Sequence, residues 1–266
     1  MGNFDGIGSD WLQILALLAV GAFALPYVLM PVIVYFSMKV SGSPTLDELP
    51  LNHPKLPEEV TQYLIRTVKQ VRADGFEILG SYFLGSIVPL VKTFAVLLGN
   101  PATRDKALVT VIYATGPTGT KLAQKHIEFS TRFRDGTIID THNSEELGAF
   151  KVPPEQYLVA LPWIADVRYL YQIHQAATEY FCPRGVKVWP AGDDWEAYLR
   201  RVLVEEVSKQ IDTGYVRRDS AGDFRPTLKG AIIMSYKNIW PIKAILKARQ
   251  RQRGRQLLRE LGFGDE

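Results

Sequence analysis

The stretch WLQILALLAVGAFALPYVLMPVIVYFSM, residues 11–38, contains no charged residue and separates a short N-terminus from the rest of the chain. A hydrocarbon core about 30 Å thick needs about 20 helical residues, so this run is long enough to cross a bilayer. Trp11 and Tyr35 stand near its two ends, where membrane interfaces favour aromatic rings. Pro26 and Pro31 predict a kink in such a helix rather than its end. The sequence therefore predicts an N-terminal transmembrane helix.

The flanks of this run predict its orientation. A cleaved signal peptide requires a basic start and a shorter apolar core, but the first ten residues hold two aspartates and no lysine or arginine. Lys39 follows the run, and more basic residues follow between positions 55 and 72. The positive-inside rule then predicts a single-pass protein of the cell membrane, with its N-terminus outside and its body in the cytoplasm. The single cysteine, Cys182, agrees with this side because it cannot form a disulfide within the chain.

The composition of the chain and the positions of its prolines predict five parts. Charged residues make up 22% of the sequence, an ordinary value for a globular protein, which argues against extended disorder. Three prolines between 41 and 56 predict an extended linker. The expected parts are an extracytoplasmic tail with the span (1–40), the proline-rich linker (41–56), an α+β domain (57–185), a helix-hairpin module (186–240) and a basic amphipathic tail helix (241–266).

The α+β domain is expected to begin with a helix at 57–74, where apolar residues recur at helical spacing and two glutamates occupy the first turn. The apolar stretch 76–98 has two interpretations. A second membrane span would place the body on the other side of the membrane. Pro89 and Lys92 make a poor span, however, and aromatic and β-branched residues favour two strands, at 76–84 and 90–98.

The stretch KHIEFSTRFR, residues 125–134, is the clearest strand because apolar and polar residues alternate along it. Asp135-Gly136 then predicts a two-residue hairpin turn, because both central positions of such a turn need a positive φ. With further strands at 107–114 and 137–141, we expect an antiparallel meander of about five strands, packed with amphipathic helices in an α+β arrangement. Other expected elements are loops or turns at 100–105, 116–120 and 143–154, helices at 161–181, 193–212, 228–239 and near 241–261, and a hairpin at 215–227.

Residues 207–230 run from a helix through DTGYVRR and a short turn to DFRPTLKG. This order resembles the recognition helix and wing of winged-helix DNA-binding domains. The resemblance implies that the helix would enter the major groove and that the wing would contact the backbone. Glu205, Glu206 and Asp212 on the candidate helix would face phosphates unfavourably. We therefore predict a winged-helix-like interaction module and do not expect nucleic acid as its partner.

Two groups of polar residues are candidate chemical sites. His126 and Glu128 lie two apart on the clearest strand and so point to the same side, as in a sheet face that either lines a site or meets solvent. Asp140 and His142 follow at the end of the return strand. These four residues form the speculative polar site. His174 occurs on an apolar helical stripe and is interpreted as a core residue.

No nucleophile, metal-ligand or phosphate-loop motif accompanies these residues, so no catalytic residue, metal or cofactor is predicted. The leading hypothesis is a binding or scaffolding protein at the cytoplasmic face of a membrane. The alternatives are an enzyme with an acid–base site between the meander and helix 161–181, using His126, Glu128 or His142, and a membrane-tethered nucleic-acid binder.

The C-terminal tail carries basic residues without an acidic one from Lys237 to Arg259. Anionic lipid head groups would attract such a tail at about 1 kcal/mol per basic residue, and phosphates of nucleic acid are the other polyanion considered. A solvated helix without a partner is the remaining interpretation. The predicted lipid or phosphate contacts are Lys243, Lys247, Arg249, Arg251, Arg253 and Arg255.

Overall fold

The computed structural model describes residues 5–54, 56–85, 90–116 and 119–264. One seven-stranded sheet forms its centre, with the strands in sequence order across the sheet. All neighbouring strands are antiparallel except β6 and β7, which are parallel. The fold is therefore α+β, with a mostly antiparallel sheet. The strands are β1 (Asp47–Glu48), β2 (Glu77–Leu84), β3 (Val91–Gly99), β4 (Lys106–Gly116), β5 (Gly119–Arg132), β6 (Ile138–His142) and β7 (Gln156–Ala160).

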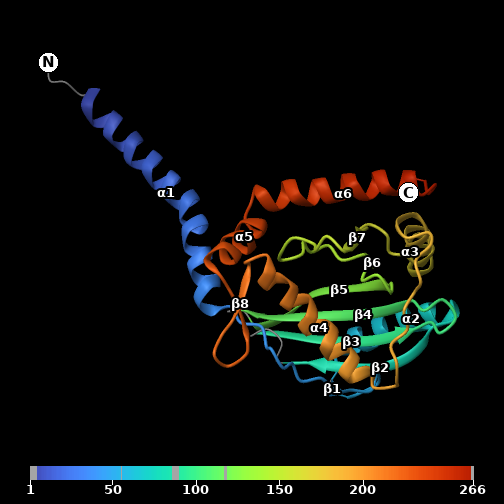
Figure 1. Cartoon of the computed structure of the whole chain (residues 1–266). Coiled ribbons are helices and arrows are strands. Elements are labelled where there is room, and N and C mark those ends of the chain that lie inside the picture. Colours follow the sequence, from blue (N-terminus) through green and yellow to red (C-terminus); the bar gives the residue numbers. More distant parts are fainter. Residues whose placement is uncertain (1–4, 55, 86–89, 117–118, 265–266) are drawn as a thin grey trace.

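Helices cover both faces of this sheet (Figure 1). On one face, α2 and α3 enclose the main apolar core, which includes Val68, Val109, Phe129 and Leu170. On the other face, α4 packs over β2 to β4 through a smaller cluster around Tyr198 and Leu199. The described helices are α1 (Asp5–Ser37), α2 (Glu58–Ala73), α3 (Val167–Phe181), α4 (Trp195–Asp212), α5 (Leu228–Asn238) and α6 (Ile242–Glu260), and the hairpin of β8 (Val216–Arg218) and β9 (Phe224–Pro226) separates α4 from α5.

The strands and helices that the sequence predicted are largely observed. The meander consists of β2 to β6, and the stretch 76–98 contributes two strands rather than a second helix. Gly75 ends α2 with a positive φ of 88°, a conformation that glycine adopts without strain. The turn predicted at 116–120 includes residues 117 and 118, which lie outside the described part of the chain, as do residues 86–89 between β2 and β3.

Three features were missed or misplaced. β1 lies within the predicted linker, and β7 follows the predicted polar loop as a parallel edge strand. β1 has only two residues, and β7, with the sequence QYLVA, shows no alternation of apolar and polar residues. The helix expected from residue 161 begins only at Val167, because the Asp166 side chain caps it by accepting a hydrogen bond from the Tyr169 amide at 2.8 Å.

The prediction of a transmembrane helix at residues 11–38 is wrong. The stretch does form α1, but in the part of the chain that the structure describes no helix combines the length and the apolar character that crossing a membrane requires. While Leu25, Val28 and Phe36 in the second half of α1 remain exposed, one side of the same half packs on α5 (Figure 1). There the Tyr27 hydroxyl donates a hydrogen bond to the Trp240 carbonyl, and its ring meets Tyr236 edge to face. The predicted single-pass topology, outside N-terminus, cytoplasmic body and cell-membrane location are corrected together with the helix.

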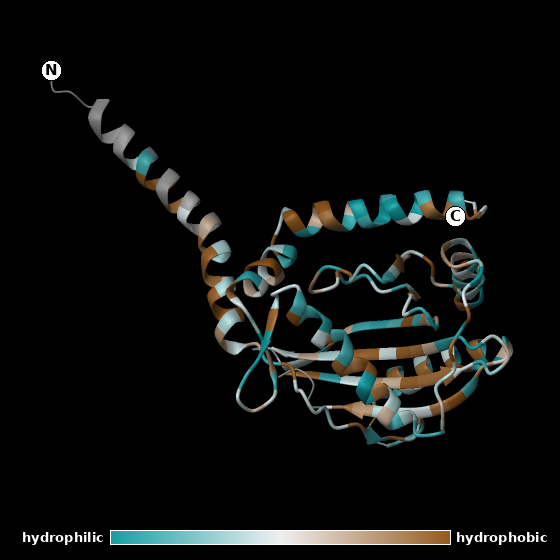
Figure 2. Cartoon of the chain, in the orientation of Figure 1, coloured by the Kyte–Doolittle hydropathy of each residue, from teal (hydrophilic) through white to brown (hydrophobic). Residues whose placement is uncertain are grey.

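The basic tail forms α6, which lies along the β7 edge and is mostly hydrophilic in its second half (Figure 2). Leu258 is buried in the main core. At Gly254 the helix approaches the body closely, since a Cβ there would lie 2.7 Å from the Trp163 ring and 3.0 Å from the Ala160 carbonyl oxygen. α6 therefore forms part of the folded body rather than a free tail.

Candidate functional site

The structure brings the four residues of the speculative polar site together. Glu128 on β5 lies directly opposite His142 on β6, and Ser130 lies opposite Asp140. Cross-strand partners and residues two apart on a strand point to the same side of a sheet. His126, Glu128, Asp140 and His142 therefore share one face, where they meet α4.

This is the opposite face from the one that the enzyme hypothesis used. α3 (formerly expected at 161–181) packs against the side of the sheet that carries Phe129, Thr131 and Thr141. Alternation along β5 showed that two faces exist, but it did not show which helix would cover which face. The polar side chains of β5 lie beneath α4 because the apolar side chains of the same strand face α3 and α2.

A cavity of about 500 Å³ opens over His126, Glu128 and His142. Its floor is polar and comes from β5, β6 and α4, whereas its walls are mainly apolar and come from the loop between β6 and β7, the end of α1, the β8–β9 hairpin and α5. Such a combination of apolar walls with a few convergent polar groups is typical of small-molecule sites. The apolar lining residues include Met38, Val40, Leu147, Phe150, Val152, Leu158, Val207, Val216, Phe224 and Met234.

Carboxyl groups at the floor favour their protonated forms. Burial, followed by the nearby Asp140 and Glu206, raises the pKa of Glu128 well above its ordinary value. Burial also raises the pKa of Asp140, although Ser130 and Gln156 oppose this by hydrogen bonding, the latter at 2.5 Å. Burial raises the pKa of Glu206 to about 7. Three carboxyl groups at one site cannot all ionise at low cost, so the cluster retains protons near neutral pH.

The two histidines at the floor are neutral. Burial lowers the pKa of His126 to about 4, and burial together with His126 lowers the pKa of His142 to about 4. The Nδ1 of His142 accepts a hydrogen bond from the Ser144 amide at 3.1 Å, so its proton must reside on Nε2. The buried Nδ1 of His126 has no hydrogen-bond partner among the described residues.

This arrangement can exchange hydrogen bonds and protons with a bound molecule. A carboxylic acid with a raised pKa donates a proton, and a neutral imidazole accepts one. Glu128 and His126 supply these two capacities from neighbouring positions on β5. The acid–base enzyme remains a prediction, with its site now at α4.

Several site residues were missed in the sequence. Glu206, Lys209 and Gln210 of α4 line the cavity, as does Gln156 of β7. A signal was present for Glu206, because it follows Leu199, Val202 and Leu203 at helical spacing and so continues the stripe that faces the sheet. An acidic residue on an apolar stripe indicates a polar contact with the body, and Glu206 makes it at the open edge of the cavity, where its side chain stays exposed.

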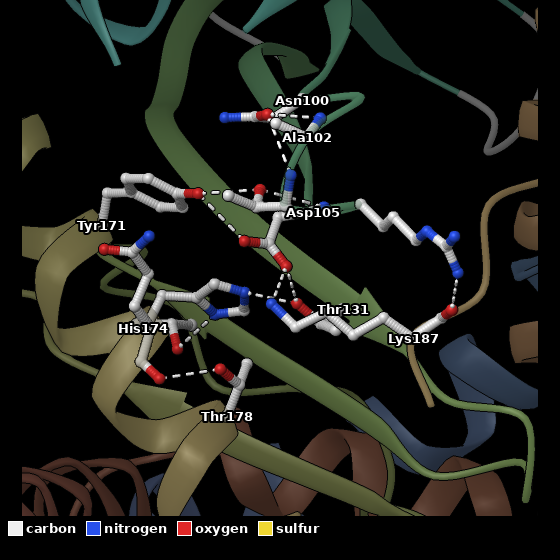
Figure 3. A network of polar contacts seen from close by, with 12 residues as sticks. Asn100, Ala102, Asp105, Thr131, Tyr171, His174, Thr178 and Lys187 are labelled. Carbon is white, nitrogen blue, oxygen red and sulfur yellow. Dashed lines mark hydrogen bonds and ion pairs between the residues drawn. The ribbon is translucent and has the colours of Figure 1, made fainter. Parts of the chain in front are cut away.

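The α3 face carries a second polar cluster, which differs in being fully hydrogen-bonded (Figure 3). The buried carboxylate of Asp105 accepts hydrogen bonds from Thr131 at 2.6 Å, Lys187 at 2.7 Å and Tyr171 at 2.9 Å. Burial raises the pKa of Asp105, but His174, Lys187 and Thr131 more than offset this, so its pKa lies below the ordinary value. Asp105 is therefore ionised and held by three donors.

His174 is the core histidine that the sequence predicted, and it completes this cluster. Its Nε2 lies 2.9 Å from the Thr131 hydroxyl and its Nδ1 lies 3.0 Å from the Thr141 hydroxyl. Because Thr131 gives its own proton to Asp105, Nε2 must be the donor and Nδ1 the acceptor. Burial lowers the pKa of His174 to about 4, so the ring is neutral. Because both of its ring nitrogens are hydrogen-bonded within the core, we interpret His174 as a structural residue.

The winged-helix-like module does not present α4 as a free helix. Tyr198 and Leu199 pack on the sheet, Glu206 borders the cavity, and Glu205 pairs with Arg132 at 3.2 Å. The helix is therefore occupied by contacts within the chain. A role of this module in binding other molecules remains a prediction.

The basic residues predicted to contact phosphate or lipid head groups fall into two sets in the structure, lysines near glutamates and exposed arginines. Lys243 pairs with Glu146 at 3.3 Å, and Lys247 lies 3.9 Å from Glu145. Arg249, Arg251, Arg253 and Arg255 are exposed, and Arg255 lies over the Trp163 ring. Contact of this helix with phosphate or lipid remains a prediction.

Within the described ranges, no group of three or more histidine, cysteine, aspartate or glutamate side chains is arranged to hold a metal ion. Comparison with protein-family models, with curated proteins and with solved structures gave no match, so no family relationship supports a function for this chain.

Proposed function

We propose that the chain binds a small, largely apolar organic molecule in the cavity beneath α4. The observation that carries this proposal is the joint presence, in one cavity of about 500 Å³, of apolar walls and the polar floor formed by His126, Glu128 and His142. Cavities of about 300–1,000 Å³ accommodate drug-sized ligands and are usually lined in this way. The proposal keeps the expectation of a binding protein and assigns this cavity as its site.

The floor also favours the kind of polar group that such a ligand carries. Protonated Glu128 and the Nε2–H of His142 are neutral hydrogen-bond donors. A carbonyl oxygen can accept both without bringing a net charge into the cavity, and burying a charged group there would cost more. The expected ligand is thus an apolar molecule with an uncharged acceptor group.

Benzophenone tests this proposal because it combines two apolar rings with one carbonyl group and reacts with nearby C–H bonds when irradiated. Met38 and Met234 line the cavity, whereas Met30 is exposed on α1. Methionine is a preferred target of this reaction. We expect peptide mass spectrometry of the irradiated full chain to show label at Met38 and Met234 in preference to Met30.

The Val207→Trp variant supplies the matched control, because Val207 lines the cavity and a larger side chain there would fill it. Circular dichroism should first show that the variant is folded. Label at the two cavity methionines should then fall by about tenfold, equivalent to about 1.4 kcal/mol in affinity, while label at Met30 stays constant. Labelling confined to Met30, or unchanged in the variant, would contradict the proposal.

A further inference from the structure

A second, smaller cavity of about 50 Å³ lies between the sheet and α4. It shares Glu128 and Glu206 with the larger cavity, but it also contains Lys106 and Arg132. Its volume is sufficient for a few atoms beyond a single water molecule. The cavity therefore forms a compartment for a very small molecule next to the proposed ligand site.

Lys106 is the unusual residue of this compartment. Only 4% of it is exposed, and its buried Nζ has no hydrogen-bond partner among the described residues. The nearest rings are those of Trp189 and Tyr198, whose centroids lie 5.3 and 5.7 Å from Nζ. The adjacent carboxylate of Asp105 is already hydrogen-bonded to Lys187 on the other face. Burial without a hydrogen-bond partner disfavours the ammonium and the two rings favour it, so this environment raises the share of free amine above that of an exposed lysine.

Two of the three charges that act on Lys106 lower its pKa further. Burial lowers its pKa to about 8, with further lowering by Arg132 and Lys187 and an opposing effect of Asp105. An ordinary lysine has a pKa of 10.5. At pH 7 the share of free amine at Lys106 is thus on the order of 300 times that of an ordinary lysine. A free amine is a nucleophile.

We propose that Lys106 is a covalent attachment site for a small aldehyde, which it binds as a Schiff base. The amine nitrogen adds to the aldehyde carbon to give a carbinolamine. The carbon–oxygen bond then breaks, the hydroxyl leaves as water after accepting a proton, and the nitrogen loses its proton. The sum is one imine and one water from one amine and one aldehyde.

The carboxyl groups in the compartment can support this dehydration. Glu128, Asp140 and Glu206 line the same cavity as Lys106, and burial raises the pKa of each. A protonated carboxyl group can deliver a proton to the leaving hydroxyl and recover one from the nitrogen. The inference does not depend on the ligand of the larger cavity, because Lys106 lines only the smaller one.

The test uses the full chain, acetaldehyde and sodium cyanoborohydride, which reduces an imine to a stable secondary amine by adding hydride and a proton. Peptide mass spectrometry then compares Lys106 with the exposed Lys69 and Lys121. At pH 7 we expect Lys106 to be labelled about tenfold faster or more. Its rate should level off above pH 8, while the rates at the exposed lysines continue to rise.

One outcome of this labelling experiment would overturn the proposal. If Lys69 and Lys121 are labelled while Lys106 in the folded chain is not, the amine is sealed in the core and is structural. The Lys106→Met variant, checked by circular dichroism, should lose only the fast phase of labelling. A fast phase that persists in this variant would assign it to another residue. Neither result affects benzophenone labelling, so failure here is distinguishable from failure of the proposed function.

Discussion

The two faces of the central sheet carry polar clusters of opposite character. On the α3 face, Asp105, Thr131 and His174 are buried and satisfy one another through hydrogen bonds (Figure 3). On the α4 face, Lys106 and His126 have buried nitrogen atoms without partners in the described structure, and the nearby carboxyl groups favour protonation. Both faces belong to the same strands, so the difference arises from what covers them.

This difference separates a structural role from a functional one. Buried polar groups are normally hydrogen-bonded, and a complete network stabilises a unique core. Groups that remain unpaired beside a cavity are those that a ligand can pair. The α3 cluster is therefore expected to control stability, and the α4 cluster to control binding.

The largest effect is expected from Asp105→Ala. The substitution removes the acceptor of three hydrogen bonds and leaves the partly buried Lys187 without its partner. Loss of one partner of a buried pair costs about 3–5 kcal/mol in the free energy of unfolding. Urea denaturation monitored by circular dichroism would measure it. Asp140→Ala is the comparison from the α4 face and should cost only about 1–2 kcal/mol. Equal losses would contradict the division between the faces.

A somewhat smaller effect is expected on the pH dependence of the free energy of unfolding, through His174. Burial lowers the pKa of His174 to about 4 from an ordinary value of 6.5. As the pH falls from 6.5 towards 4, the unfolded chain binds a proton at this residue while the folded chain does not. The free energy of unfolding should therefore fall over this window, by about 2–3 kcal/mol from His174 alone. Well above pH 6.5, His174 no longer contributes to the pH dependence of the free energy of unfolding.

The His174→Gln variant tests this pH dependence, because glutamine retains polar groups but does not titrate. Its absolute stability will differ, so the slope of stability between pH 6.5 and 4.5 is the quantity to compare. We expect a shallower slope than in the unsubstituted chain, with His126, His142 and the carboxyl groups of raised pKa beside them accounting for what remains. An identical slope would show that His174 takes up its proton in the folded state.

The smallest effects come from a matched pair of threonines. Thr131 is fully buried and bonds to Asp105 and His174, so Thr131→Val should cost about 1–2 kcal/mol. Thr110 lies opposite His126, and its buried hydroxyl has no partner among the described residues. Thr110→Val should therefore change stability by less than about 0.5 kcal/mol. Thermal unfolding of both variants would show whether the two faces differ at the level of one hydroxyl group.

Local patterns allowed much of the secondary structure to be predicted. The alternation in residues 125–134 and the stripe of α2 depend on residues that are neighbours in the chain. β1 and β7 were missed because neither shows an alternation of apolar and polar residues in the chain. The span at residues 11–38 was wrong, since no described helix has the length and apolar character of a span and one side of α1 contacts α5 at Tyr27.

The sequence by itself determined that His126 and Glu128 point to the same side of a strand, because alternate residues do so. It predicted a two-residue turn at Asp135-Gly136, which would have placed Asp140 and His142 on the opposite face. The loop instead spans residues 134–136, and the Phe133 amide donates a hydrogen bond to the Thr137 carbonyl, so that His142 pairs with Glu128. Only the tertiary structure decided which helix covers that face, that Glu206 joins the group, and that Lys106 is enclosed beside it. The physical reason is how far apart in the chain the residues lie that set each property. Strand alternation is a local property, whereas burial, pKa and the shape of a cavity depend on segments that meet only when the chain has folded.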